Sequence, residues 1–310
     1  MTPGDARVTP TVIDTDPGID DALALLLAWG SPELAIEALT TVAGNVPVEL
    51  GSINAWRLCE LRRPVPRPIL AEGAKAPLRR PLRTAMDHHG GDGLGDAPGW
   101  PPAPPRPAAA SAVDVLIELA RRHRDRLVVI AIGPLTNLAH VLTRDATALR
   151  GVREIIAMGG AVDVRGNVTP DAEFNIHVDP DAARVVFEAG LPLTLVPLDA
   201  TRQAVLTRAE LDATLARCPG PIAERVRAFA AYGFRGLGDD VVPGITLHDP
   251  LAVGVAIDPS FVVCETMRLT VGPEGETRRA AGAPNCRVAL RVDRARFVAT
   301  FLDRLCTSPA

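Results

Sequence analysis

Lysine is nearly missing from this chain. Lys75 is the only lysine among 310 residues, and arginine supplies the other positive charges. The formal net charge is -4 at pH 7 and the basic residues form no blocks, which argues against a basic surface for nucleic acid. Long apolar runs are missing as well, since none approaches the roughly 18 residues that a membrane-spanning helix needs. We therefore expect neither a nucleic-acid partner nor a membrane.

Cysteine is also sparse. The five cysteines are scattered, odd in number and without a CxxC pair: Cys59, Cys218, Cys264, Cys286 and Cys306. This pattern argues against a disulfide framework and against a zinc site. Residues 1–7 carry an early acid and no apolar stretch, so we expect no secretory signal and a cytoplasmic location.

What the chain does have is material for a large core. Its hydrophobic content is 47% and its charged content 23%, which is ordinary for a globular protein. Apolar runs of strand length, such as residues 127–132 and 154–158, alternate with helical patterns, such as residues 111–124. This alternation predicts right-handed βαβ units, and so an α/β fold with an open, mostly parallel sheet and helices on both faces. We find no repeat and no boundary, and expect one domain over residues 1–310.

One stretch is unusually acidic. Asp14, Asp16, Asp20 and Asp21 lie within eight residues, between a β-branched run and the apolar residues 23–29. The pattern predicts a strand, a tight turn and a helix. Acids in a first helical turn complement the helix dipole, which is the plain explanation. Four such acids repel one another, however, so we favour a metal or catalytic site. Oxygen ligands without a nearby Cys or His indicate Ca²⁺ or Mg²⁺ rather than zinc.

Polar residues also follow other predicted strands. Asn45 comes after a second strand, where it either caps a helix or reaches a ligand crevice. His88 and His89 begin a Gly-rich stretch inside a long loop, which is typical of an active-site loop. A third stretch either binds sugar hydroxyls or is a polar surface loop; it contains Asn167, Glu173, Phe174 and Asn175.

These stretches together match a known family. The acidic stretch reads Asp14-Thr15-Asp16-Pro17-Gly18-Ile19-Asp20-Asp21-Ala22. Further motifs follow in order: Val42-Ala43-Gly44-Asn45, His89-Gly90-Gly91-Asp92-Gly93-Leu94-Gly95, Gly133-Pro134-Leu135-Thr136-Asn137, Met158-Gly159-Gly160, Gly166-Asn167-Val168-Thr169-Pro170, Glu173-Phe174-Asn175 and His248-Asp249-Pro250. From residue 14 to about residue 257 the chain resembles the inosine-uridine preferring nucleoside hydrolases. The resemblance implies a mixed sheet with a Rossmann-like core, and hydrolysis of the N-glycosidic bond of ribonucleosides to free base and ribose. It also implies a bound Ca²⁺, a homodimer or homotetramer, and a role in nucleoside salvage.

The resemblance also implies roles for single residues. Calcium would be held by Asp16, Asp21, Asp249 and the backbone carbonyl of Ile132. Asp16 would also be the general base, and His248 matches a position proposed to protonate or hydrogen-bond the leaving base. The residues expected to contact substrate are Asp20, Asn45, His89, Asn167, Glu173, Phe174, Asn175 and Tyr232. Asp14 would support the turn from behind.

Base preference stays open at this stage. Family members that favour pyrimidine nucleosides or inosine often carry a Tyr and an Arg before the His-Asp pair. Tyr232 and Arg235 lie nearby, but residues 236–240 break the spacing.

Two other functions deserve comparison. Phosphotransferases of the haloacid dehalogenase type also place Asp-x-Asp after a strand, but they need a downstream lysine. Lys75, in a Pro-rich loop, does not fit that role, and neither does the Asp-Pro-Gly-x-Asp-Asp continuation. A non-catalytic, calcium-dependent nucleoside or ribose binder would keep every ligand position and lose turnover. Ribose release discriminates this binder from a hydrolase.

Overall fold

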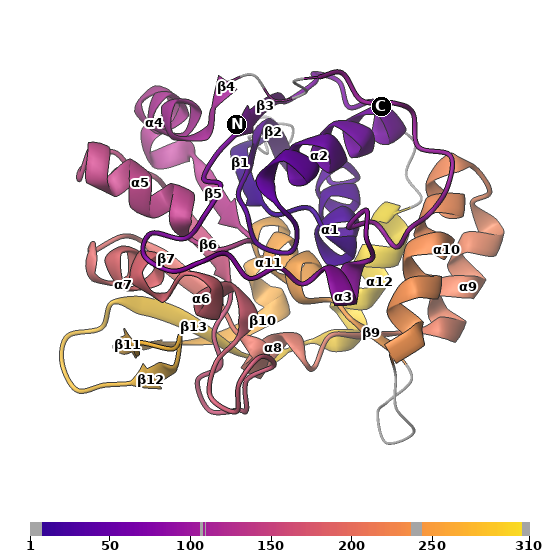
Figure 1. Cartoon of the computed structure of the whole chain (residues 1–310). Helices are drawn as coiled ribbons and strands as arrows, with labels where there is room; N and C mark the ends of the chain where they lie inside the picture. Colours follow the sequence, from indigo (N-terminus) through magenta and orange to yellow (C-terminus); the bar gives the residue numbers. More distant parts are fainter. Residues whose placement is uncertain (1–7, 106–107, 109, 237–243, 306–310) are drawn as a thin grey trace, which may run out of the picture.

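The computed structural model describes residues 8–105, 108, 110–236 and 244–305. Within these residues nine strands form one sheet, in the order β10-β13-β7-β6-β5-β1-β2-β3-β4 (Figure 1). All neighbours pair in parallel except β10 and β13. The strands are β1 (Thr9–Thr15), β2 (Leu34–Thr41), β3 (Ile69–Glu72), β4 (Ala110–Ser111), β5 (Val128–Ala131), β6 (Glu154–Met158), β7 (Leu193–Val196), β10 (Val262–Met267) and β13 (Cys286–Val292). The mostly parallel, mixed sheet expected from the sequence is confirmed.

The order of the strands reverses beside β1, at the centre of the sheet. From β1 the chain adds β2, β3 and β4 on one side, and then returns to add β5, β6 and β7 on the other. The register places Asp14 of β1 between Thr40 of β2 and Ala131 of β5. In open α/β sheets, ligands bind outside the carboxyl ends of the strands where the order reverses. The topology therefore puts the acidic turn after β1 at the expected crevice.

Both faces of the sheet are buried. Because successive side chains of a strand point to opposite faces, Ile13 and Ile130 pack into one core while Val12 and Val129 pack into the other. The first core is covered by α1 (Ile19–Trp29), α2 (Val48–Arg62), α8 (Leu198–Thr201), α9 (Arg208–Arg217), α10 (Pro221–Gly233), α11 (His248–Ile257) and α12 (Arg294–Leu305), and the second by α4 (Ala112–His123), α5 (Thr136–Arg144) and α7 (Pro180–Glu188) (Figure 1). These runs of buried residues explain why the strands read as continuously apolar.

Several short elements are not predicted by the sequence. They are α3 (Met86–His89), α6 (Phe174–Val178), the paired strands β8 (Val205–Thr207) and β9 (Gly244–Thr246), strand β12 (Thr277–Arg279), which pairs with β11 (Leu269–Val271), and the 3-10 turns η1 (Arg124–Arg126), η2 (Phe234–Gly236) and η3 (Pro259–Phe261). Segments of three to five residues are too short for a periodic pattern to show. Three of them, α3, α6 and β9, carry residues of the site.

Two expectations from composition can be checked. Cys59, Cys264 and Cys286 are free thiols. Cys218 is disulfide-bonded. The sequence argued only against a framework of disulfides, and spacing along the chain does not indicate a single bond, which needs proximity in space. Cys306 lies outside the described residues. Within the described ranges, no helix combines the length and the apolar character needed to cross a bilayer.

Candidate active site

Asp21 holds the acidic turn between β1 and α1 together. Its Oδ1 accepts hydrogen bonds from the Thr15 hydroxyl (2.5 Å) and the Asp16 amide (3.2 Å), and its Oδ2 accepts one from the Gly18 amide (3.0 Å). The side chain thus satisfies amides at the start of α1, as a helix cap does. Together with one from the Asn45 side chain, the two oxygens accept four hydrogen bonds, which matches the roughly four lone pairs of a carboxylate.

Asp16 lies between two glycines. Its Oδ2 accepts a hydrogen bond from the Asn45 amide (2.6 Å), whereas its Oδ1 is buried and has no partner in the described part of the chain. A Cβ atom added to Gly44 would lie 2.1 Å from Oδ2, and one added to Gly133 would lie 2.8 Å from Oδ1. Both positions therefore require glycine, and Asp16 is held in place with one oxygen unused.

Distant segments complete the acidic cluster. At the start of α11 the Asp249 amide donates to Oδ2 of Asp20 (3.2 Å), and Nδ2 of Asn45 donates to Oδ2 of Asp21 (3.0 Å). Oδ1 of Asp20 is buried without a partner among the described residues. Helices α1 and α11 pack against each other, which brings Asp20 and Asp249 together.

Burial and repulsion raise the pKa values of three acids of the cluster, Asp16, Asp20 and Asp249. The pKa of Asp249 lies well above its usual range, because burial disfavours the charged form and because Asp20, Asp21 and Asp16 repel it. Burial, followed by repulsion from Asp21, raises the pKa of Asp16 in the same way. Burial raises the pKa of Asp20 to about 8. Within the described ranges, none of these acids forms an ion pair with a basic side chain.

The chemistry of this donor set fits a hard cation. Oδ1 of Asp16 and Oδ1 of Asp20 are buried and unpartnered, and they belong to a group of like charges that a cation would neutralise. Among the described residues, however, no three His, Cys, Asp or Glu side chains form a group that could hold a metal ion. The Ile132 carbonyl accepts a hydrogen bond from the Asn175 side-chain amide (3.0 Å). The residues thus offer suitable oxygen atoms but no preformed cage.

Asp14 lies behind the cluster, on the face of the sheet that α5 covers. Its Oδ1 accepts hydrogen bonds from the Thr40 hydroxyl (2.5 Å) and the Asn137 amide (2.7 Å). Burial raises its pKa to about 7. These contacts link β1 to β2 and α5, so Asp14 supports the turn from behind.

Glu173 is a further buried acid, from a separate segment of the chain. It is the N-cap of α6 and accepts hydrogen bonds from the backbone amides of Asn175 (2.9 Å) and Gly160 (2.9 Å). The Asn175 side chain also donates to a carbonyl of β6, and Oδ1 of Asn167 accepts from the Phe174 amide (2.9 Å). The stretch that the sequence presents as a sugar site or a surface loop is therefore a capped helical turn beside the acids.

Two histidines, His89 and His248, also belong to the site. Nδ1 of His248 lies 2.7 Å from the Thr201 hydroxyl, and Nδ1 of His89 accepts a hydrogen bond from the Ile19 amide (3.1 Å). Burial lowers the pKa of His248 to about 4, and the nearby Arg202 charge acts in the same direction. Burial also lowers the pKa of His89 to about 4. Near neutral pH both rings are therefore neutral, and they can form hydrogen bonds without carrying charge.

A cavity of about 550 Å³ opens between these groups. It brings together most of the residues that the sequence singles out: Asp20, Asn45, His89, Ile132, Asn167, Glu173, Phe174, Asn175, His248 and Asp249. Asp16 and Asp21 are fully buried beside it. Tyr232 does not line it in the described part of the chain; its hydroxyl lies 3.5 Å from the Asp87 carbonyl, and the Arg235 guanidinium lies over its ring. Residues 237–243, which include most of the stretch that breaks the Tyr-Arg spacing, lie outside the described residues.

Other residues that line the cavity were not predicted from the sequence. Arg83, Thr84 and Asp87 come from the segment around α3, and Ile245 and Thr246 come from β9. The length of the loop after β3 was the only signal for the first three. Nothing in the sequence indicated β9, because a three-residue strand has no detectable period.

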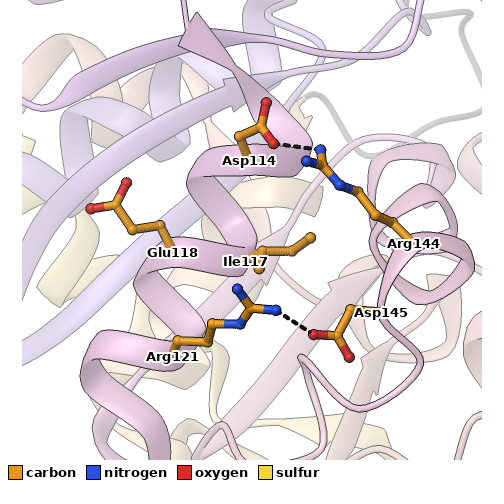
Figure 2. Close-up of a pocket in the computed structure, with 6 residues that line it drawn as sticks. All are labelled: Asp114, Ile117, Glu118, Arg121, Arg144 and Asp145. Atoms are coloured by element: carbon orange, nitrogen blue, oxygen red, sulfur yellow. Dashed lines mark hydrogen bonds and ion pairs between the residues drawn. The ribbon is translucent and has the colours of Figure 1, made fainter.

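A second hollow lies between α4 and α5 (Figure 2). Arg144 pairs with Asp114 across the two helices, and Arg121 pairs with Asp145 (2.8 Å). In the described ranges no lining residue of this hollow has a buried side-chain polar atom without a partner. Its two cross-helix ion pairs satisfy Asp114, Arg121, Arg144 and Asp145, and Glu118 pairs with Arg122 on its own helix.

Comparisons with known proteins show which family the chain belongs to. The family model described as inosine-uridine preferring nucleoside hydrolase matches residues 11–299. A pyrimidine-specific ribonucleoside hydrolase RihA of Enterobacter is 34% identical over 96% of this chain and 97% of its own length. Uridine nucleosidase 1 of Arabidopsis thaliana is 37% identical over 84% of this chain and 80% of its own length. A solved purine-preferring ribonucleoside hydrolase from Gardnerella vaginalis superposes with a TM-score of 0.90, at 31% identity, covering 96% of this chain and 98% of that one.

Proposed function

Since this chain belongs to the inosine-uridine preferring nucleoside hydrolase family and is an N-glycosyl hydrolase of ribonucleosides, we propose that the cavity beside Asp16 is its active site and that Ca²⁺ is its cofactor. The observation that carries this proposal is the buried, unpartnered Oδ1 of Asp16, which is fixed at the carboxyl end of β1 within a cluster of unpaired acids. The products, free base and ribose, suit a role in nucleoside salvage.

Asp16 is the general base in this proposal. The Asn45 amide fixes its Oδ2, which leaves Oδ1 to accept a proton from the attacking water. Asp16, Asp21, Asp249 and the Ile132 carbonyl would hold the cation. A bound Ca²⁺ would orient the water and help to lower its pKa.

The ribose would bind beside Glu173 and the neighbouring amide side chains. Asp20, Asn45, Asn167, Glu173 and Asn175 would bind its hydroxyls. Glycosidic cleavage passes through an oxocarbenium-like state, in which positive charge builds on the sugar ring. Glu173, held by backbone amides of α6, would place negative charge close to that ring.

The leaving base lies towards His89 and His248. Because the pKa of His248 lies near 4, the ring is neutral at physiological pH. Its part is therefore to hydrogen-bond the departing base, rather than to act as a charged acid. Phe174 and Tyr232 remain our candidates for further contacts with the substrate.

Ribose release tests the proposal. Purified protein is incubated with inosine, adenosine, guanosine, uridine and cytidine, before and after chelation, and then with Ca²⁺ or Mg²⁺ restored. We expect release that disappears on chelation and returns with Ca²⁺. Both purine and pyrimidine nucleosides are needed, because the names of the relatives cover both classes. Binding without release at any pH from about 5 to 9 would favour the non-catalytic binder.

A further inference from the structure

Thr201 is a buried residue that touches the site without lining it. It ends α8, just after β7, and its side chain is fully buried. Its Oγ1 lies 2.7 Å from Nδ1 of His248, and no other hydrogen bond of this hydroxyl occurs within the described residues. The other ring nitrogen, Nε2, belongs to a side chain that lines the cavity, and it is not among the buried atoms without partners. Nδ1 therefore faces the protein, while Nε2 faces the substrate space.

The contact allows two arrangements of protons. A neutral imidazole carries one N–H and one lone pair, and a hydroxyl can donate or accept. If Nδ1 carried the proton, it would donate to Thr201, and the hydroxyl hydrogen would then be buried with no acceptor among the described residues. An unsatisfied buried donor destabilises the folded state. If the hydroxyl donates to Nδ1, both hydrogens are used, because the ring proton then sits on Nε2 and points into the cavity.

We propose that Thr201 is a positioning residue that donates its hydroxyl hydrogen to Nδ1 of His248 and so fixes this ring as the Nε2–H tautomer. The inference rests on the proposed function of the cavity and assigns how His248 serves it. When the bond between the sugar and the base breaks, its electron pair moves onto the base. Negative charge then develops on ring nitrogens and carbonyl oxygens of the base, and the Nε2–H group donates to one of these acceptors. The opposite tautomer would present a lone pair there and would repel the leaving base.

The tautomer can be measured without any substrate. In ¹⁵N NMR of the histidine-labelled wild-type protein at neutral pH, we expect Nδ1 of His248 to give the resonance of an unprotonated nitrogen and Nε2 that of an N–H. Assignment uses the spectrum of H248Q, in which these signals disappear. A protonated Nδ1 in the wild-type protein overturns the proposal, whatever the enzyme does with nucleosides.

Kinetics of Thr201 variants test the consequence. For Thr201→Val we expect kcat on nucleosides to fall roughly tenfold to hundredfold with little change in KM, because the lost orientation matters most as the base departs. Thr201→Ser keeps the hydroxyl and should recover most of the rate. The matched control is Thr194→Val in β7, which removes another buried hydroxyl, one that donates to Glu154, and should leave kcat unchanged.

An activated substrate separates positioning from general damage. In 4-nitrophenyl riboside the leaving phenolate needs no hydrogen-bond donor, so Thr201→Val should hydrolyse it at nearly the wild-type rate. Equal losses on this substrate and on nucleosides, or full nucleoside activity in Thr201→Val, overturn the proposal. If the wild-type protein releases no ribose at all, the proposed function fails, and the NMR measurement still decides the tautomer.

Discussion

The cavity beside Asp16 and the hollow between α4 and α5 are both rich in carboxylates, but these carboxylates have different partners in the two regions. In the hollow, Asp114 and Asp145 each face an arginine from the other helix (Figure 2). In the cavity, the acids face one another and a set of backbone amides, and within the described ranges no basic side chain pairs with them. Asp114 is largely exposed, whereas Asp16 is fully buried.

The contrast distinguishes structural charges from functional ones. A surface ion pair satisfies itself and contributes little to stability. A buried group of like charges lowers the stability of the folded chain, unless protons or a ligand relieve the repulsion. Folded proteins tolerate such conflicts mainly at functional sites. The unpaired cluster is therefore the part of the fold in which protons or a ligand are needed to relieve repulsion between buried acids.

The strongest test of this difference between the two regions is to neutralise one acid in each. For Asp16→Asn we expect kcat/KM on nucleosides to fall by at least about a thousandfold, because the proton acceptor is lost while the shape is kept. The free energy of unfolding in the absence of a cation should stay equal or rise, since one buried like charge is gone. Steady-state kinetics and urea denaturation provide the two measurements.

The matched variant is Asp114→Asn, which neutralises an exposed acid of the hollow. It should keep wild-type kinetics. If Asp16→Asn retained activity, or if Asp114→Asn lost it, the assignment of the two regions would be wrong.

A cation should stabilise the folded protein through the acids of the cavity and not through those of the hollow. With the cation at a hundredfold excess over its Kd, binding to the folded state alone raises the free energy of unfolding by about 2.7 kcal/mol. We expect Ca²⁺ to raise the Tm of the chelated wild-type protein and of Asp114→Asn equally. Asp249→Asn should lose most of this shift, because a proposed ligand is missing. An undiminished shift in Asp249→Asn would place the cation elsewhere.

A smaller effect is expected at the wall of the cavity. Glu173→Gln replaces one acceptor oxygen with an amide that faces backbone N–H groups of α6 and of Gly160. The lost hydrogen bond and the misplaced donor should lower the free energy of unfolding by about 1–3 kcal/mol and raise KM. Glu118→Gln in the hollow, which removes an exposed pair with Arg122, should cost less than about 0.5 kcal/mol. Similar losses in both variants would contradict the capping role of Glu173.

Much of this site could be predicted from the sequence because its parts follow strands. Asp16 and Asn45 stand directly after two parallel strands, and the carboxyl ends of parallel strands meet at one edge of a sheet. Local patterns therefore pointed Asp16 towards the crevice without any knowledge of contacts, and for Asn45 they left a helix cap as the alternative. The family resemblance added Asp249, whose chain neighbourhood alone says little.

The remaining features depend on contacts between distant residues. Thr201 and His248 are 47 positions apart, and no pattern in either segment indicates the hydrogen bond that joins them. Glu173 looked like part of a polar loop because α6 is only five residues long. The ion pairs of the hollow also join residues on neighbouring helices, and no local pattern indicates them.

The smallest effect belongs to Asp145, whose titration runs opposite to that of the buried acids. Hydrogen bonds from Thr147, and then from Arg121, lower the pKa of Asp145 to about 2. A carboxyl whose pKa is lower in the folded state stabilises the fold above its unfolded pKa of about 3.9, and this contribution is lost as the pH falls towards 2. NMR titration should find the low pKa in the wild-type protein. Thr147→Val should move it part of the way back to the ordinary value, because the hydrogen bonds from the residue 147 amide and from Arg121 remain, and Arg121→Ala should move it less. An unchanged pKa in both variants would show that neither neighbour stabilises the charge, and the hollow could then no longer serve as the self-satisfied counterpart of the cavity.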